Sequence, residues 1–223
     1  MKKTQSVIII GASEHAKVIV DIFEKEGHTN IVGFVDSNKQ IGSEHAGYPI
    51  LGNEEIISEL LNKYPGCKLF IAIGDNWTRK QVKDKIDTLV PKTEYISAIH
   101  PSAIIGKNVV IGNGVAIMAG AIINPYSQID SFSIINTRSS VDHDCIIGKF
   151  SSLAPGVTLG GNVKIGEYTA ISIGAIITHG TNIGDQVIIG AGALLLNDCE
   201  DNAVMYGTPA KKIKMREAGE KYL

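Results

Sequence analysis

An aliphatic residue recurs at every sixth position through the second half of the chain. All 17 positions reached in steps of six from Ile99 to Leu195 hold Ile, Val or Leu, and the residue two places before each is Ser, Ala, Val, Cys or Thr. A period of six matches neither the 3.6-residue repeat of an α-helix nor the two-residue alternation of a strand. It predicts a solenoid in which each hexapeptide forms one short strand and one corner, and three hexapeptides complete a triangular coil.

The aliphatic residue of each hexapeptide is expected to fill the interior of the coil, and stacked coils are expected to pair as parallel strands about 4.8 Å apart. Glycine often follows the aliphatic residue, which we interpret as the backbone freedom that a tight corner needs; these glycines are Gly106, Gly112, Gly148, Gly160, Gly166, Gly184 and Gly190. Both ends of such a stack expose unpaired strand edges. We expect the first half of the chain to cover one end and the tail to cover the other.

Strand and helix patterns alternate in the first half of the chain. Short apolar runs predict strands and segments of helical period predict the helices between them: strands at 7–11, 31–37 and 67–76, helices at 16–27, 53–64 and 77–90. This order predicts a small parallel sheet with crossover helices, in which ligands bind beyond the carboxyl ends of the strands. The predicted organisation is a Rossmann-like α/β domain over 1–95, a parallel β-helix over 96–200 and a C-terminal tail over 201–223.

The composition excludes several classes of function. The 21 basic and 23 acidic residues give a formal net charge of −2, which argues against a nucleic-acid partner. No apolar run approaches the roughly 20 residues that span a bilayer, so no membrane span is expected. The three cysteines are odd in number and lack metal-ligand spacing, which favours a reducing, cytoplasmic location.

The stretch NTRSSVDHDCIIG, at 136–148, carries the most distinctive polar residues of the solenoid. The hexapeptide register places Asp142 in a corner and Cys145 in the interior, whereas His143 and Asp144 point outward. One interpretation is a solvated histidine in a polar turn. The other is a general base, His143, with Asp144 fixing its tautomer and strengthening its basicity.

A metal site at His143 is not expected. His179 follows 36 residues later, two coils along the same edge, where the strand spacing predicts a separation of roughly 10 Å. A catalytic zinc ion needs about three protein ligands, and the sequence offers no third one nearby.

Several stretches of the chain resemble one bacterial family. They are IIIGASEHAKVIVDI, AIGDNWTRKQV, AIHPSAIIG, IINTRSSVDHDCIIG and NAVMYGTPAKKIK, in that order. Together they resemble the sugar acyltransferases of the hexapeptide-repeat superfamily, in particular nucleotide-linked 4-amino-sugar N-acetyltransferases of the bacillosamine and perosamine type and sialic-acid O-acetyltransferases. The resemblance implies a left-handed β-helix, which the period alone does not give.

The resemblance also implies partners and site residues. It implies a homotrimer whose active sites lie between neighbouring solenoids, with acetyl-CoA along the groove and a nucleotide-linked sugar, UDP-linked in the first instance, held by the first domain. The implied catalytic residues are His143 and Asp144. Residues implied to bind the sugar nucleotide are Ser13, Glu14, His15, Asp36, Ser37, Gly74, Asn76 and Asn136. Residues expected to contact the coenzyme are Ser152, Gly161, Ile173 and Ala191, with the backbone N–H near Gly160 or Gly161 stabilising the oxyanion and Lys211 or Lys212 available to the coenzyme phosphates.

Three positions depart from the family pattern. Glu14 replaces a glycine of the loop that approaches phosphate, and so adds bulk and a like charge. Ser152 stands where the family often has a second histidine, and Arg138 stands where it has Gly or Ser. Arg138 is a candidate partner for a phosphate or carboxylate, or else a surface residue.

The sequence therefore predicts an acetyl-CoA-dependent N-acetyltransferase acting on the 4-amino group of a nucleotide-linked sugar. One alternative is an O-acetyltransferase for sialic acid or a related sugar. Another is a non-catalytic protein that binds a sugar nucleotide, in which Glu14 and Ser152 mark lost activity.

Overall fold

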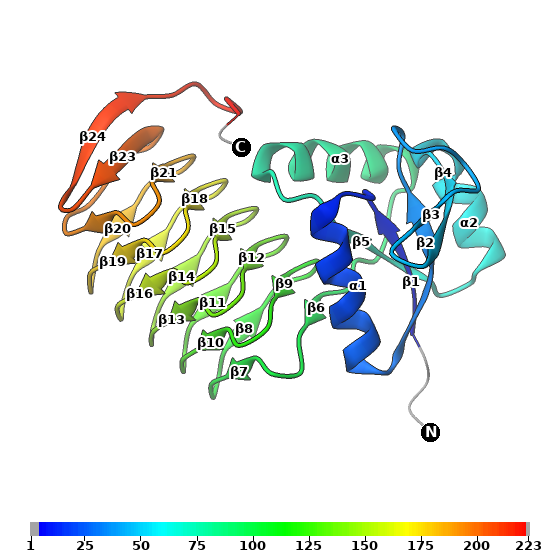
Figure 1. The fold of residues 1–223 in the computed structure, drawn as a ribbon, viewed down its shortest axis with the longest axis horizontal. Coiled ribbons are helices and arrows are strands. Elements are labelled where there is room, and N and C mark those ends of the chain that lie inside the picture. The colour runs from blue at the N-terminus through cyan, green and yellow to red at the C-terminus, as the bar shows by residue number, and fades with distance from the viewer. Residues whose placement is uncertain (1–4, 222–223) are drawn as a thin grey trace.

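The computed structural model describes residues 5–221 and shows a front domain, from β1 to α3, lying against a triangular solenoid (Figure 1). The front domain contains β1 (Gln5–Ile10), α1 (Glu14–Glu26), β2 (Thr29–Val35), β3 (Glu44–His45), β4 (Tyr48–Gly52), the 3-10 turn η1 (Glu54–Ile56), α2 (Ile57–Lys63), β5 (Lys68–Ile71) and α3 (Asn76–Leu89). Its sheet has the order β3-β4-β2-β1-β5 and is parallel except for the β3–β4 pair.

The predicted helices and strands of the front domain are all present, and local chemistry explains their ends. The helix α1 ends at Gly27, which is left-handed with φ 68°, as a C-terminal glycine permits. The Asn53 side chain accepts the Glu55 N–H, and the Asp75 side chain accepts the Thr78 N–H at the start of α3. The β3–β4 hairpin was not predicted, because its strands are short and its apolar pattern is weak.

The solenoid strands are each two residues long. They are β6 (Ala98–Ile99), β7 (Ile104–Ile105), β8 (Val110–Ile111), β9 (Ala116–Ile117), β10 (Ile122–Ile123), β11 (Gln128–Ile129), β12 (Ile134–Ile135), β13 (Ser140–Val141), β14 (Ile146–Ile147), β15 (Ser152–Leu153), β16 (Thr158–Leu159), β17 (Lys164–Ile165), β18 (Ala170–Ile171), β19 (Ile176–Ile177), β20 (Asn182–Ile183), β21 (Ile188–Ile189) and β22 (Leu194–Leu195). Every third strand belongs to the same sheet. The sheets that begin at β7 and β8 have six and five strands, and the sheet that begins at β6 has eight, because two strands of the tail extend its six solenoid strands.

Each solenoid strand pairs in parallel with the strand one coil later. Ile123 of β10 lies opposite Val141 of β13, which in turn lies opposite Leu159 of β16. The aliphatic position faces inward and is buried through most of the stack, whereas Ile105 in the first coil is 37% exposed. This arrangement confirms the predicted fold class, an α/β domain followed by a left-handed parallel β-helix.

Buried hydroxyls at the small position are satisfied by hydrogen bonds within the solenoid. The Ser151 hydroxyl donates to the Gly166 carbonyl and accepts the Thr169 N–H, and the Thr169 hydroxyl repeats both contacts with Gly184 and Val187. A small polar residue is tolerated there because each buried polar group finds a partner.

The glycines that follow the aliphatic residues do not have the role predicted for them. The left-handed conformation lies two residues further on, at the third residue after each aliphatic from Ile105 to Ile189, and residues other than glycine adopt it at many of these corners. The glycines themselves lie against the next coil. A Cβ on Gly148 would come within 2.6 Å of the Gly166 carbonyl carbon, and one on Gly160 within 2.7 Å of the His179 amide nitrogen. Contact between coils, and not a positive φ, requires glycine here.

The front domain packs against the first strands of the eight-stranded sheet, and the tail extends the far end of this sheet. Side chains of its first strands, including Ala98, Ala116 and Ile134, share one apolar core with α1 and the front-domain sheet. The tail forms β23 (Ala203–Gly207), parallel to β21, and β24 (Ala210–Met215), antiparallel to β23, at the far end of the stack (Figure 1). Over residues 5–221, no helix combines the length and apolar character needed to cross a membrane.

Candidate active site

His143 lies in the corner between β13 of the six-stranded sheet and β14 of the five-stranded sheet. Its Nδ1 is 2.7 Å from Asp144 Oδ2, and Asp144 itself takes the left-handed corner position with φ 59°. Asp142 Oδ1 accepts the His143 N–H at 2.8 Å and the Asn124 side-chain amide at 2.9 Å. Asp142 therefore stabilises the turn from the corner that the hexapeptide register predicts, while Asp144 is bonded to the imidazole.

The electrostatics of this corner suit a base. The hydrogen bond that His143 donates to the Asp144 carboxylate raises the pKa of His143 above its ordinary value, opposed by partial desolvation. When the Nδ1 proton is shared with the carboxylate, the Nε2 lone pair is left as the acceptor. That atom lies over Gly161, where a Cβ would come within 2.6 Å of Nε2. Gly161 thus leaves room for the ring, and its N–H donates no hydrogen bond to any residue within 5–221.

The rings of His143 and His179 are closer than the spacing of the coils implies. Their centroids are 6.4 Å apart and the rings are tilted by 53°, whereas roughly 10 Å was expected from the strand spacing. The expected value is a spacing between strands, whereas the observed distance is measured between the side-chain rings. In the part of the chain that the structure describes, no three His, Cys, Asp or Glu residues are grouped as metal ligands.

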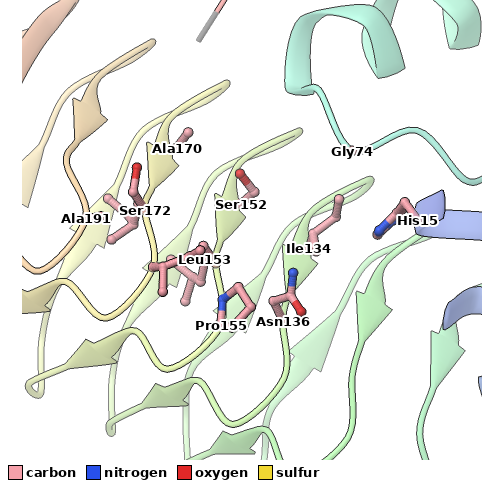
Figure 2. A pocket seen from close by; sticks show the side chains of 13 residues that line it. His15, Gly74, Ile134, Asn136, Ser152, Leu153, Pro155, Ala170, Ser172 and Ala191 are labelled. Carbon is pink, nitrogen blue, oxygen red and sulfur yellow. The ribbon is translucent and has the colours of Figure 1, made fainter. Parts of the chain in front are cut away.

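A second group of predicted residues lines a cavity of about 360 Å³ between the front domain and the eight-stranded sheet. Figure 2 shows His15 and Gly74 on the front-domain side, facing side chains carried by the solenoid. The predicted residues among those that line it are His15, Gly74, Asn136, Ser152, Ile173 and Ala191. The cavity therefore unites sugar-binding and coenzyme-binding candidates from both halves of the chain.

His15 is the most unusual polar group in this cavity. Its Nε2 is buried and has no hydrogen-bond partner in the protein. Burial, and secondarily the positive charge of Arg79, lowers the pKa of His15 to about 4. The ring is therefore neutral at pH 7 and has an open nitrogen for a ligand.

The other front-domain candidates lie at the carboxyl ends of β1 and β2, outside the lining of the cavity. Glu14 opens α1, and its side chain is 86% exposed and bonded to Lys17 at 2.7 Å, so the bulk that replaces glycine points into solvent. Asp36 accepts backbone N–H groups from Ala12 and Asn38, each at 2.7 Å. These bonds tie the first loop to the end of β2.

Two of the candidates are occupied by contacts within the protein. The Ser37 hydroxyl donates to Glu54, which also bonds Lys85. Asn76 is only 1% exposed, and its amide donates to the Thr169 carbonyl at 3.1 Å. The structure thus places Asn76 in the joint between the two parts of the molecule and not in the cavity, because α3 begins directly on the solenoid. Sequence reasoning missed its partner there, Arg79.

One chain does not bring all the predicted residues together. His143, Asp144 and Gly161 lie where the six-stranded sheet meets the five-stranded sheet, whereas Asn136 lies where the eight-stranded sheet meets the six-stranded sheet. The whole six-stranded face of the solenoid separates the two corners. The base and the cavity are therefore two separate half-sites in a single chain.

The front domain and the triangular solenoid have the architecture of the β-helical acyltransferases, and the comparisons with known proteins agree. The family model of the PglD N-terminal domain matches residues 6–86. Among solved structures, PerB from Caulobacter crescentus in complex with CoA and GDP-perosamine has a TM-score of 0.87 and 35% identity, covering 94% of this chain and 97% of that one. The acetyltransferase domain of PglB from Neisseria gonorrhoeae in complex with acetyl coenzyme A has a TM-score of 0.83 and 31% identity, covering 94% and 100%.

A curated relative is also similar to this chain. The UDP-N-acetylbacillosamine N-acetyltransferase of Bacillus subtilis (strain 168) is 33% identical over 116 residues, and the match spans 52% of each protein, about half the length of that relative. The chain belongs to the family of bacterial nucleotide-sugar N-acetyltransferases that includes these proteins.

Proposed function

We propose that the protein transfers the acetyl group of acetyl-CoA to the 4-amino group of a nucleotide-linked amino-deoxy sugar. The observation that carries this proposal is His143, which is held by Asp144 through Nδ1 and presents Nε2 above Gly161. The likeness to PerB and to the PglB domain supports the choice of co-substrate and acceptor. No metal takes part in the proposed reaction.

The chemistry follows from these groups. The sugar amine attacks the thioester carbonyl, and His143 Nε2 accepts the amine proton. The oxyanion that forms is stabilised by the N–H of Gly161. When the carbon–sulfur bond breaks, CoA leaves as a thiolate that takes the proton back from the imidazolium. Acetylated sugar and CoA are the products, and the histidine returns to its neutral form.

Asp144 is expected to set the pH dependence of this step. Because Asp144 raises the pKa of His143, the wild-type base is deprotonated only at higher pH, and kcat/KM rises with pH through that pKa. Asp144→Asn removes the charge that favours imidazolium, so the acidic limb of the kcat/KM profile should move to lower pH while the plateau falls. The acceptor amine titrates identically in both proteins and cancels in the comparison. An unmoved limb would show that His143 is not the titrating base.

The active site is proposed to lie between subunits of a homotrimer. The two half-sites of one chain stand on different corners, and the six-stranded face between them exposes Ile104, Ile122 and Ile176 to the extent of 60%, 36% and 47%. A neighbouring solenoid on this face would cover these side chains and bring its His143 to the cavity, whose solenoid wall includes Asn136. Coenzyme would then run along the wall formed by Ser152, Ile173 and Ala191, with its phosphates near Lys211 or Lys212.

Mixed oligomers test the shared site. His143→Ala and Asn136→Ala subunits are each expected to be nearly inactive alone. Co-expression of the two should restore part of the activity, because some sites combine an intact His143 with an intact Asn136 from the neighbour. No recovery in verified mixed trimers would mean that both residues act within one chain.

UDP is proposed as the nucleotide and the cytoplasm as the location. The named substrate of the Bacillus subtilis relative supports UDP, whereas the PerB complex makes GDP the rival, and kcat/KM with the two sugar nucleotides decides between them. Cys67, Cys145 and Cys199 are all free and buried, which fits a reducing compartment.

The acceptor distinguishes the proposal from its alternatives. CoA release is expected with nucleotide-linked 4-amino sugars. Release of CoA with sialic acid instead would support an O-acetyltransferase, because the acceptor would then be a hydroxyl. A hydroxyl depends on assistance from a general base more than an amine does. Tight binding of a sugar nucleotide without any release of CoA would support a non-catalytic binding protein.

A further inference from the structure

The guanidinium of Arg79 is buried where the front domain meets the solenoid. Arg79 is 1% exposed, yet all five of its N–H donors have acceptors. They bond to the carbonyls of Phe132 (2.8 Å), Ile73 (2.8 Å), Gly74 (2.8 Å) and Phe150 (3.0 Å) and to the side-chain oxygen of Asn76 (2.7 Å). A buried charge with every donor satisfied, four of them by backbone, is a specific structural device.

The acceptors of Arg79 come from two parts of the molecule. The Ile73 and Gly74 carbonyls follow β5, and Gly74 lines the cavity. The Phe132 and Phe150 carbonyls belong to corners of two successive coils of the solenoid. One side chain therefore ties the front-domain edge of the cavity directly to the solenoid.

Asn76 extends this tie to a third coil. Its oxygen accepts from Arg79 at 2.7 Å, and its amide donates to the Thr169 carbonyl at 3.1 Å and the Tyr168 carbonyl at 3.4 Å. Phe132, Phe150 and Tyr168 are one coil apart and all left-handed, with φ between 57° and 61°. Arg79 and Asn76 together bond the carbonyls of all three corners.

The aromatic rings at these corners make the anchor rigid. Phe132 and Phe150 stack with centroids 5.0 Å apart, and Phe150 and Tyr168 with centroids 5.5 Å apart. Tyr95 and Trp77 of the front-domain side meet the two ends of this stack edge to face. Because the corner backbones are fixed by their own side chains, the carbonyls offered to Arg79 are fixed too.

We propose that Arg79, aided by Asn76, is a positioning residue for the acceptor. By fixing Gly74 against the solenoid, it sets the width of the cavity between His15 on one wall and Asn136 and Ser152 on the other. This inference rests on the proposed function for the identity of the ligand. It predicts that a sugar nucleotide, which must span both walls, depends on Arg79, whereas the coenzyme, whose proposed contacts lie on the solenoid and the tail and not on the front domain, does not.

Arg79→Lys is the most informative substitution, because lysine keeps the positive charge but has three donors on one nitrogen and cannot reach both groups of carbonyls. The KM for the 4-amino sugar nucleotide should rise by at least about tenfold. This change corresponds in free energy to one or two good hydrogen bonds between the sugar nucleotide and the walls of the cavity. The KM for acetyl-CoA should stay within about twofold. Arg216→Lys, on the tail, is the matched control and should change neither constant.

Calorimetric binding separates this inference from the proposed function. Arg79→Lys should leave the Kd of CoA and of UDP or GDP alone unchanged and weaken only the additional affinity contributed by the attached sugar. That pattern supports the positioning role of Arg79 even if no acceptor releases CoA. The proposed role of Arg79 is overturned if the substitution weakens the binding of all ligands equally, or if it does not weaken the binding of the sugar nucleotide. Should Arg79→Lys not fold, Asn76→Ala removes the contacts to the third coil and one of the five acceptors of Arg79, while the four backbone carbonyls still hold the guanidinium. It should give the same selective effect with a smaller magnitude.

Discussion

The His143→Ala variant is expected to retain no more than about one hundredth of the wild-type kcat, since a positioned general base contributes roughly 10²–10⁴-fold. The loss should appear in kcat more than in the KM for acetyl-CoA. The imidazole acts on the proton of the attacking amine, and the proposed coenzyme contacts lie on other residues.

A second histidine provides the control for this variant. His28, in the front domain, has a side chain 47% exposed, against 49% for His143, and it lies outside the proposed site. His28→Ala should leave kcat unchanged. If His143→Ala lowers kcat by less than about tenfold, His143 is not the general base.

Phe150→Ala is expected to cost about 3–5 kcal/mol of the free energy of unfolding, as for other buried Phe-to-Ala changes. Phe150 is 6% exposed and lies between Phe132 and Tyr168 in the aromatic stack under α3. Removing it leaves a cavity and loosens the corner whose carbonyl Arg79 binds. For a chain of this size, a loss of that order should lower Tm by roughly 6–20 °C.

Tyr126→Ala is the matched control for Phe150→Ala. Tyr126 is also an aromatic residue in a left-handed corner, with φ 66° against 57° for Phe150, but it is 56% exposed. The backbone cost of alanine is the same in both variants, so the difference in Tm isolates the buried stack. Equal and small losses in the two variants would contradict the anchoring role of the aromatic column.

The solenoid could be predicted in detail because the position of a residue in the six-residue period determines whether its side chain points into the coil or out of it. Every aliphatic position and every small position of the hexapeptide is set by the interior of the coil, so the register follows from residues such as Ile147 and Cys145. The role of the glycines could not be predicted. The sequence shows that Gly148 is small, but only the stacked coils show that Gly166 occupies the space where its Cβ would lie.

The site was predictable where a residue acts through its position in a coil and not where it acts through distant contacts. The register predicted that His143 and Asp144 project outward together, and the structure joins them at 2.7 Å. In contrast, the sequence pattern alone indicates an exposed position for Arg79, in the first turn of a helix. Its burial depends on the carbonyls of Phe132 and Phe150, which are 53 and 71 residues away along the chain.

The separation of His143 from the cavity could also not be predicted from the sequence of one chain. The resemblance implied a site between subunits, and in the structure Asn136 and His143 occupy different corners of the triangle, an arrangement that fits this proposal. The sequence orders these corners along the coil, but the cavity beside one of them exists only because the front domain folds back over the eight-stranded sheet.

The proposed reaction is tested most directly by thiol release from acetyl-CoA in the presence of a UDP-linked 4-amino-deoxy sugar, compared with the same sugar nucleotide carrying an already acetylated amine. We expect release of one CoA for each free amine consumed, with an acetylated sugar nucleotide as the product, and no release with the blocked amine. Release that is equally fast with the blocked amine, or absent with UDP-linked and GDP-linked amino sugars alike, would contradict the assignment of this protein as an amino-sugar N-acetyltransferase.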